Sequence, residues 1–121
     1  MIQKILIASG ILILGIILIT QTQTITGLST SEIENSVIID VRTFQEHFEE
    51  RIPNSILMPY DNIENLIGNQ VQDKNKEIFV YCRSGRRSSI AKQKLESIGY
   101  TNVIDLGGII DWSGPTISGA N

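Results

Sequence analysis

The chain has 121 residues, of which 41% are hydrophobic and 19% charged, so it can form one small folded domain and is too apolar for a disordered chain. With 10 Lys+Arg against 13 Asp+Glu its formal net charge is −3, and without a basic block to neutralise phosphates we expect no nucleic-acid partner. The single cysteine, Cys82, excludes an internal disulfide, and with only one histidine, His47, we expect neither a metal nor a cofactor.

The N-terminus differs in composition from the rest of the chain. An uncharged apolar run covers residues 5–19, directly after Lys4. A helix of this length would be about 22 Å long, between the core of a signal peptide and a membrane-spanning helix. Neither an Ala-x-Ala cleavage site nor a lipid-accepting cysteine follows, which favours a retained anchor. We therefore interpret residues 1–23 as a signal peptide or membrane anchor, with a buried core helix as the alternative.

The charges around this run predict its orientation. Lys4 and the free amine precede it, and the first charge after it is Glu32. Because positively charged flanks stay on the cytoplasmic side, the body of the protein is expected outside the cytoplasm, in the periplasm or on the outer face of the membrane, either anchored or exported.

Residues 24–121 show the alternation of an α/β domain. Residues 37–41 and 77–81 are short, nearly continuous apolar runs rich in β-branched or aromatic residues, typical of strands buried on both faces. Residues 55–58 and 102–105 are weaker strand candidates, and residues 23–26 are a candidate edge strand.

Helix starts are predicted by three pairs that match the capping box, in which an N-cap side chain and a glutamate three residues later satisfy first-turn amides. These pairs are Ser29 with Glu32, Thr43 with Glu46, and Asp61 with Glu64. A further helix is predicted over residues 88–98, ended by Gly99 in a left-handed conformation. The tail after Gly114 is expected to be loose.

The most informative segment lies where the strand ending at Tyr81 runs into residues 82–87 and then into the helix from Ser88. A strand–loop–helix junction is an anion site, because unpaired amides and the helix dipole point beyond the strand. Cys82 is expected at the mouth of this junction, where amides and arginines lower the pKa of a thiol, so it should be a thiolate nucleophile. The alternative is a buried structural cysteine, which fits poorly beside three arginines.

This loop resembles the active-site loop of rhodanese-type sulfurtransferases, and two further segments resemble the same family in the same order. The loop reads Cys82-Arg83-Ser84-Gly85-Arg86-Arg87-Ser88. The other segments are Asp40-Val41-Arg42 followed by Glu46, Ile52-Pro53 and Met58-Pro59, and Gly99-Tyr100 followed by Leu106-Gly107-Gly108-Ile109 and Trp112. The chain departs from the family pattern at Glu50-Arg51 in place of Gly-His, at Asn54-Ser55 in place of Gly-Ala, and in a shortened end after Trp112.

The resemblance implies a single rhodanese domain, a five-stranded parallel sheet flanked by helices on both faces, preceded here by the N-terminal hydrophobic helix. It implies that Cys82 takes a sulfane sulfur from a donor such as thiosulfate and passes it from a persulfide to cyanide or a thiol. The partners would be small sulfur donors and acceptors, a thiol-containing protein, and the membrane. The residues expected to bind substrate are Arg83, Ser84, Gly85, Arg86 and Arg87, with Arg87 foremost in attracting the sulfonate end of the donor.

Several nearby residues are expected to be structural. His47 should be partly exposed and not catalytic, and Asp40 and Arg42 should form an ion pair or hydrogen bonds that shape the loops. Gly107 and Gly108 should allow a close backbone approach beside the active loop, and Trp112 should cap the core.

Three other functions use a similar thiol. A phosphatase needs arginine at the sixth position after cysteine, which here is Ser88, with Arg87 at the fifth. A thiol–disulfide oxidoreductase or arsenate-type reductase needs a second thiol, which this chain does not have. A sulfur carrier or binding module without turnover would use the same persulfide and remains the main alternative.

Overall fold

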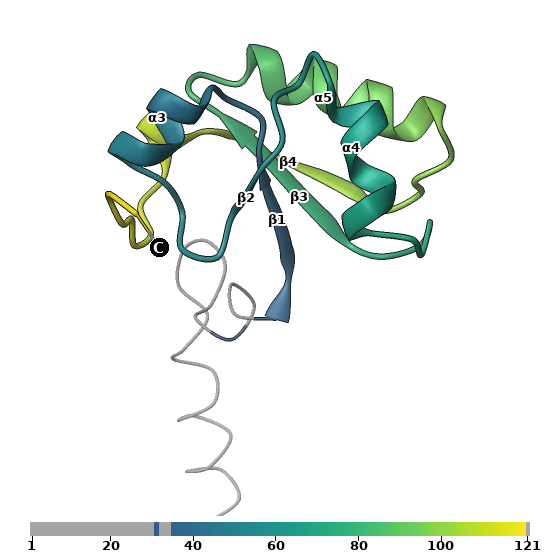
Figure 1. The fold of residues 1–121 in the computed structure, drawn as a ribbon, viewed down its shortest axis with the longest axis horizontal. Helices are drawn as coiled ribbons and strands as arrows, with labels where there is room; N and C mark the ends of the chain where they lie inside the picture. Colours follow the sequence, from purple (N-terminus) through teal and green to yellow (C-terminus); the bar gives the residue numbers. More distant parts are fainter. Residues whose placement is uncertain (1–30, 32–34, 121) are drawn as a thin grey trace, which may run out of the picture.

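The computed structural model describes residue 31 and residues 35–120 (Figure 1). Strands and helices alternate along the chain, beginning with β1 and ending with the short 3-10 helix η1. The elements are β1 (Val37–Asp40), α3 (Phe44–Glu49), β2 (Ile56–Leu57), α4 (Ile63–Gln70), β3 (Ile78–Cys82), α5 (Arg86–Ser97), β4 (Val103–Gly108) and η1 (Ile109–Asp111).

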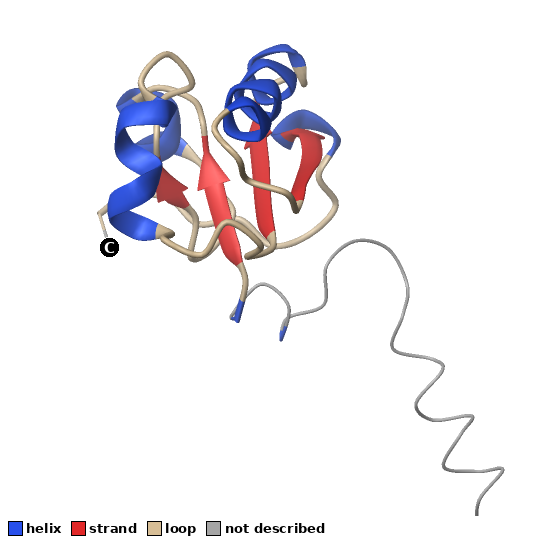
Figure 2. Ribbon diagram, turned by 90° about the vertical axis from the view of Figure 1, so that its right-hand side faces the viewer, coloured by secondary structure: helices blue, strands red, loops and turns tan. Residues whose placement is uncertain are grey.

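The strands form one parallel sheet in the order β2-β1-β3-β4, as expected for strands joined by helical crossovers. Helices α4 and α5 cover one face, and α3 and η1 lie on the other side (Figures 1 and 2). The expectation of five strands is corrected, because the described residues form four. The expected edge strand at residues 23–26 lies outside the described residues, so β2 and β4 are the edges of the described sheet.

Side chains alternate between the two faces of the central strands and so build two hydrophobic cores. Towards α4 and α5 point Ile39 of β1 and Ile78, Val80 and Cys82 of β3, all at most 1% exposed. The opposite core consists of Ile38, Ile52, Phe79, Tyr81 and Ile109. Since β1 and β3 are covered on both faces, their continuous apolar runs are explained.

Two of the three predicted capping boxes fall in the described chain, and one of them forms. The Thr43 side chain accepts from the Glu46 amide, and the Glu46 carboxylate accepts from the Thr43 amide. The prediction at Asp61 is wrong, because α4 begins one residue later with Asn62 at its N-cap and no side-chain cap. The Asn62 amide donates to the Pro59 carbonyl in a turn that displaces the helix start. The predicted box at Ser29 lies outside the described residues.

Helix α5 starts two residues before the predicted position and ends one residue before it, and the predicted left-handed Gly99 is confirmed. Gly85 precedes it with φ 105°, a left-handed conformation that lets the loop turn directly into the helix. At the other end Gly99 has φ 101°, its amide bonds to the Glu96 carbonyl, and the Tyr100 amide bonds to the Leu95 carbonyl. This pair of bonds is a Schellman motif.

The C-terminal tail is held in place, contrary to the expectation that it is loose. Arg51, which is 3% exposed, exchanges backbone hydrogen bonds with Ile117 at 2.9 Å in both directions. Its Nη1 donates to the carbonyl of Gly119 at 2.7 Å, and the Gly119 amide donates to the Phe48 carbonyl. Arg51, which stands where the family pattern has histidine, therefore holds the tail against the end of α3.

In the part of the chain that the structure describes, no helix is long and apolar enough to cross a bilayer. The hydrophobic helix predicted within residues 1–23 lies outside that part and stays a prediction.

Replacing Arg51 with alanine should lower the free energy of unfolding by about 2 kcal/mol, since it removes charged hydrogen bonds to the partly buried carbonyls of His47 and Gly119. Urea denaturation followed by tryptophan fluorescence measures this change. The exposed Lys76→Ala is the control and should unfold at the wild-type urea concentration; equal midpoints for the two variants would contradict the role assigned to Arg51.

Candidate functional site

The cysteine predicted as nucleophile lies inside the loop that follows β3. Cys82 is the last residue of β3 and is 1% exposed, so the expectation that it stands at the mouth of the junction is corrected. Strand alternation turns its side chain towards α5, beside Val80, and residues 83–87 fold over the sulfur. The thiol is therefore both part of the core and the centre of the loop.

Hydrogen-bond donors surround the Cys82 sulfur. The Gly85 amide donates to Sγ at 3.0 Å, and the Ser88 hydroxyl lies 3.4 Å from it. Burial by itself raises the pKa of Cys82, but hydrogen bonds from the Ser88 hydroxyl and from the amides of Ser88, Gly85 and Ser84 outweigh it, so the pKa lies below its ordinary value. The arrangement stabilises a thiolate in a buried place.

Ser88 lies beside the sulfur, although the sequence prediction left it out of the site. Its side chain is fully buried, and Oγ lies 3.1 Å from the Gly85 carbonyl and 3.4 Å from the sulfur. A hydroxyl is both donor and acceptor, so it can accept from the neutral thiol and donate to the thiolate. The sequence offered one indication that Ser88 belongs to the site: it lies three residues after Gly85, in the first turn of the helix that follows the loop.

The three loop arginines have different surroundings. Arg83 and Arg86 are exposed. The guanidinium of Arg87 instead donates to both carboxylate oxygens of Glu46, with Nη1–Oε1 at 2.7 Å and Nη2–Oε2 at 2.8 Å. These hydrogen bonds lower the pKa of Glu46 to about 2. The predicted chief anion contact is thus engaged by a carboxylate from α3.

A second charged cluster, centred on Asp40, lies at the end of β1. Arg42 donates to both oxygens of Asp40 at 2.8 Å, which confirms the expected ion pair. The Tyr81 hydroxyl donates to Asp40 Oδ2 at 3.0 Å, and burial together with the Asp40 charge raises the pKa of Tyr81 to about 12. His47 Nδ1 lies 2.9 Å from the same oxygen, which agrees with a structural role for His47.

The glycines of β4 act differently from each other. A Cβ on Gly108 would come within 2.2 Å of the Arg83 carbonyl oxygen and 2.7 Å of the Ser84 Cα, so the predicted close approach to the loop is confirmed there. Gly107 has no atom within 4 Å of such a Cβ but adopts φ +79°, which is why glycine suits it. Trp112 packs against the core that contains Tyr81 and Ile109, as predicted.

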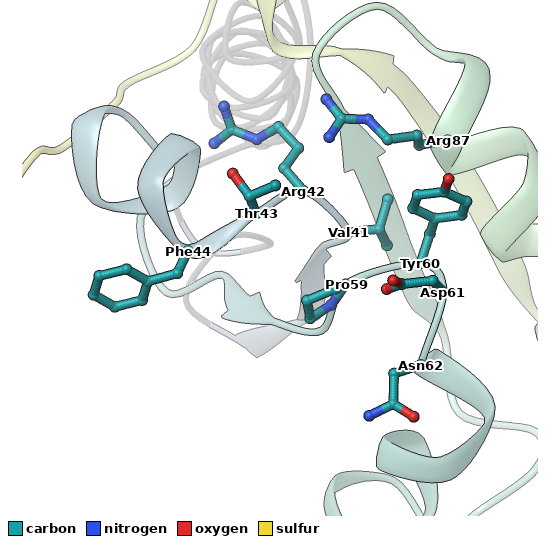
Figure 3. Close-up of a pocket in the computed structure, with 9 residues that line it drawn as sticks. All are labelled: Val41, Arg42, Thr43, Phe44, Pro59, Tyr60, Asp61, Asn62 and Arg87. Carbon is teal, nitrogen blue, oxygen red and sulfur yellow. The ribbon is translucent and has the colours of Figure 1, made fainter.

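Two pockets lie next to the Arg87–Glu46 pair. The first, of about 380 Å³, is lined by Arg87 and by residues that follow β1 and β2, and the side chains of Arg42 and Arg87 point to the same side of it (Figure 3). The second, of about 310 Å³, contains Glu46, Arg83 and Ile110. Arg42 lines both pockets. The loop thus borders two separate hollows, each large enough for a small molecule.

Comparison with known proteins identifies similar chains. Residues 27–114 match the family described as Rhodanese-like domain. Thiosulfate sulfurtransferase PspE of Escherichia coli is 37% identical over 67% of this chain and 78% of that protein. A putative sulfur carrier protein of Bacillus subtilis, YrkF, is 34% identical over 69% of this chain. The match covers only 44% of the length of YrkF. The solved structure "rhodanese with anions from E. coli" has a TM-score of 0.67 and 36% identity, covering 69% of this chain and 99% of that one.

Replacing Ser88 with alanine should raise the pKa of Cys82, because it removes the hydroxyl that donates to the thiolate. At a pH below the wild-type thiol pKa, alkylation by iodoacetamide should slow about five-fold, the equivalent of one hydrogen bond of about 1 kcal/mol. The midpoint of the alkylation rate against pH should move upward. Ser89→Ala, an exposed neighbour on the same helix, is the matched control, and a Ser88→Ala profile that overlays it would contradict the role of Ser88.

Proposed function

Since the chain belongs to the family of rhodanese-like domains, whose members similar to it include sulfurtransferases, we propose that it is a sulfurtransferase acting through a persulfide on Cys82. The donor is a sulfane-sulfur compound such as thiosulfate, and the acceptor is cyanide or a thiol, including a thiol carried by a protein. The observation that carries this proposal is the ring of donors around the Cys82 sulfur, because it favours the thiolate that the reaction needs.

In the first step the Cys82 thiolate attacks the outer sulfur of thiosulfate. A new S–S bond forms at Sγ, the S–S bond of the donor breaks, and sulfite leaves with the electron pair. No proton transfer is required, since both the attacking and the leaving groups are anions. This agrees with a site in which His47 is held by Asp40 instead of facing the sulfur.

In the second step the persulfide waits as an anion until an acceptor attacks its outer sulfur. The Gly85 amide and the Ser88 hydroxyl, which stabilise the thiolate, are placed to stabilise this anion as well. Cyanide would leave as thiocyanate and a thiol as a new persulfide. In either case the electron pair returns to Sγ, and the thiolate is restored.

Arg83 and Arg86, exposed at the loop, would meet the sulfonate end of the donor before Arg87 does, because Arg87 is engaged by Glu46. The similar E. coli structure is described as a rhodanese with anions, which supports an anionic ligand for this chain as well. A phosphatase is disfavoured, because Arg87 at the fifth position is already held and the sixth position is the buried hydroxyl of Ser88.

A sulfur carrier without turnover is the second candidate, favoured by the similarity to YrkF. Such a protein would form the same persulfide and release it only to a particular partner. The two functions differ in whether a small acceptor discharges the persulfide.

For the location we propose the periplasm or the outer face of the membrane, with residues 1–23 as signal peptide or anchor. The apolar run at residues 5–19 after Lys4 supports this proposal. Intact-mass measurement of the protein from membrane and soluble fractions tests it: the full-length mass in membranes indicates an anchor, a chain shortened near residue 23 indicates export, and a full-length cytoplasmic protein contradicts both.

Treatment of the purified protein with thiosulfate should add one sulfur, about 32 Da, to Cys82, and cyanide should remove it with formation of thiocyanate. Intact-mass spectrometry and thiocyanate detection measure the two half-reactions. Cys82→Ser should show neither the adduct nor turnover.

The outcomes separate the candidates. An adduct that cyanide and small thiols leave in place would favour the carrier. Hydrolysis of a phosphate ester by the wild-type protein, without any sulfur adduct, would overturn the sulfurtransferase proposal.

A further inference from the structure

The Glu46–Arg87 ion pair is held by two hydrogen bonds and is partly shielded from solvent. Its two hydrogen bonds, at 2.7 and 2.8 Å, use both terminal nitrogens of the guanidinium and both oxygens of the carboxylate. The side chains are only 21% and 22% exposed, so solvent screens the pair weakly compared with one on an open surface. Bidentate pairs of this kind fix geometry as well as charge.

Glu46 is also held from its other side. The amide of Thr43 donates to Oε1 at 3.3 Å, and the Thr43 hydroxyl donates to the same oxygen at 3.2 Å. With its pKa lowered to about 2, the carboxylate is ionised at neutral pH. Glu46 therefore presents a permanent, fixed negative charge to the last arginine of the active loop.

The pair also borders both hollows beside the loop. Arg87 lines the pocket of about 380 Å³, and Glu46 lines the pocket of about 310 Å³. Glu49 and Glu50 also line the smaller pocket, but both are exposed, so solvent screens their charges more than that of Glu46. The loop composition predicts three free positive charges, but the folded site offers fewer.

We infer that Glu46 is a specificity-determining positioning residue, which neutralises Arg87 and so tunes the site towards sulfur donors with a single negative charge over dianions. The interaction of the Glu46 charge with a bound donor is proportional to the charge of the donor, so a dianion suffers twice the repulsion of a monoanion. This inference rests on the proposed sulfur transfer to Cys82 and names the class of donor that the site prefers.

The experiment compares two donors that deliver the same outer sulfur. Thiosulfate is a dianion, and methanethiosulfonate is a monoanion. With the second, the Cys82 thiolate attacks the outer sulfur, the donor S–S bond breaks, and methanesulfinate leaves with the electron pair, so charge and atoms balance as they do for thiosulfate. The rate of persulfide formation on Cys82 is followed by quenched-flow mass spectrometry at several donor concentrations.

Glu46→Gln keeps a side-chain oxygen for Arg87 and for the helix cap but removes the charge. The second-order rate constant with thiosulfate should rise at least about three-fold more than that with methanethiosulfonate, through tighter donor binding and with the limiting rate nearly unchanged. Glu49→Gln is the matched control: it removes a charge from the same helix and pocket, but its Oε1 accepts from Gln45 instead of Arg87. It should change the ratio of the two rate constants less than about two-fold.

Three results would overturn the inference: a fall with both donors in Glu46→Gln, an equal rise with both, or the same change in ratio in Glu49→Gln. A second variant tests it even if Glu46→Gln does not fold. Arg83→Gln/Arg86→Gln keeps the Glu46–Arg87 pair but removes the two exposed loop arginines. Its thiosulfate rate should not fall as ionic strength rises to about 0.15 M, because no uncovered arginine of the loop attracts the dianion; a steep fall would contradict the neutralised pair. Absence of any persulfide with either donor would instead refute the proposed function itself.

Discussion

The structure depends above all on the hydrogen bonds that converge on the sulfur of Cys82. Burial at the end of β3 would by itself keep this thiol protonated, and the donors from the loop and from Ser88 reverse that effect. Two backbone features allow the loop to close so tightly: the left-handed conformation of Gly85 and the missing side chain of Gly108, on which a Cβ would meet the Arg83 carbonyl. Cys82 is therefore both a packed core residue and the residue whose ionisation the loop controls.

Two bidentate ion pairs organise the charge around that sulfur. The pair of Asp40 with Arg42 is buried and is completed by Tyr81 and His47, which makes it a structural joint between β1, β3 and α3. The pair of Glu46 with Arg87 is partly exposed and joins α3 to the active loop. A loop rich in arginine thus carries less free positive charge than its composition indicates, which is the basis of the donor preference proposed for it.

The sequence alone predicted those features that depend on neighbouring residues. The buried strands were visible as apolar runs at residues 37–41 and 77–81, and the Thr43 capping box and the left-handed Gly99 follow from residues within a few positions of each other. The loop around Cys82 was recognisable for the same reason, since its amides and its arginines are contiguous. Where a local pattern competed with another, as at Asp61 beside the turn from Pro59, the prediction was wrong.

Tertiary structure decided the features that join distant segments. Arg87 meets Glu46 across 41 positions of sequence, and Arg51 holds the tail at Gly119 across 68. The residues near Arg87 in the sequence do not indicate that a carboxylate will pair with it. The burial of Cys82 and Ser88 follows from how β4 and α5 pack around the loop. The local sequence therefore set the chemical groups of the loop, its thiol and its amides. The fold set the charge and access of the site, because electrostatic and packing interactions depend on distance in space and not on separation along the chain.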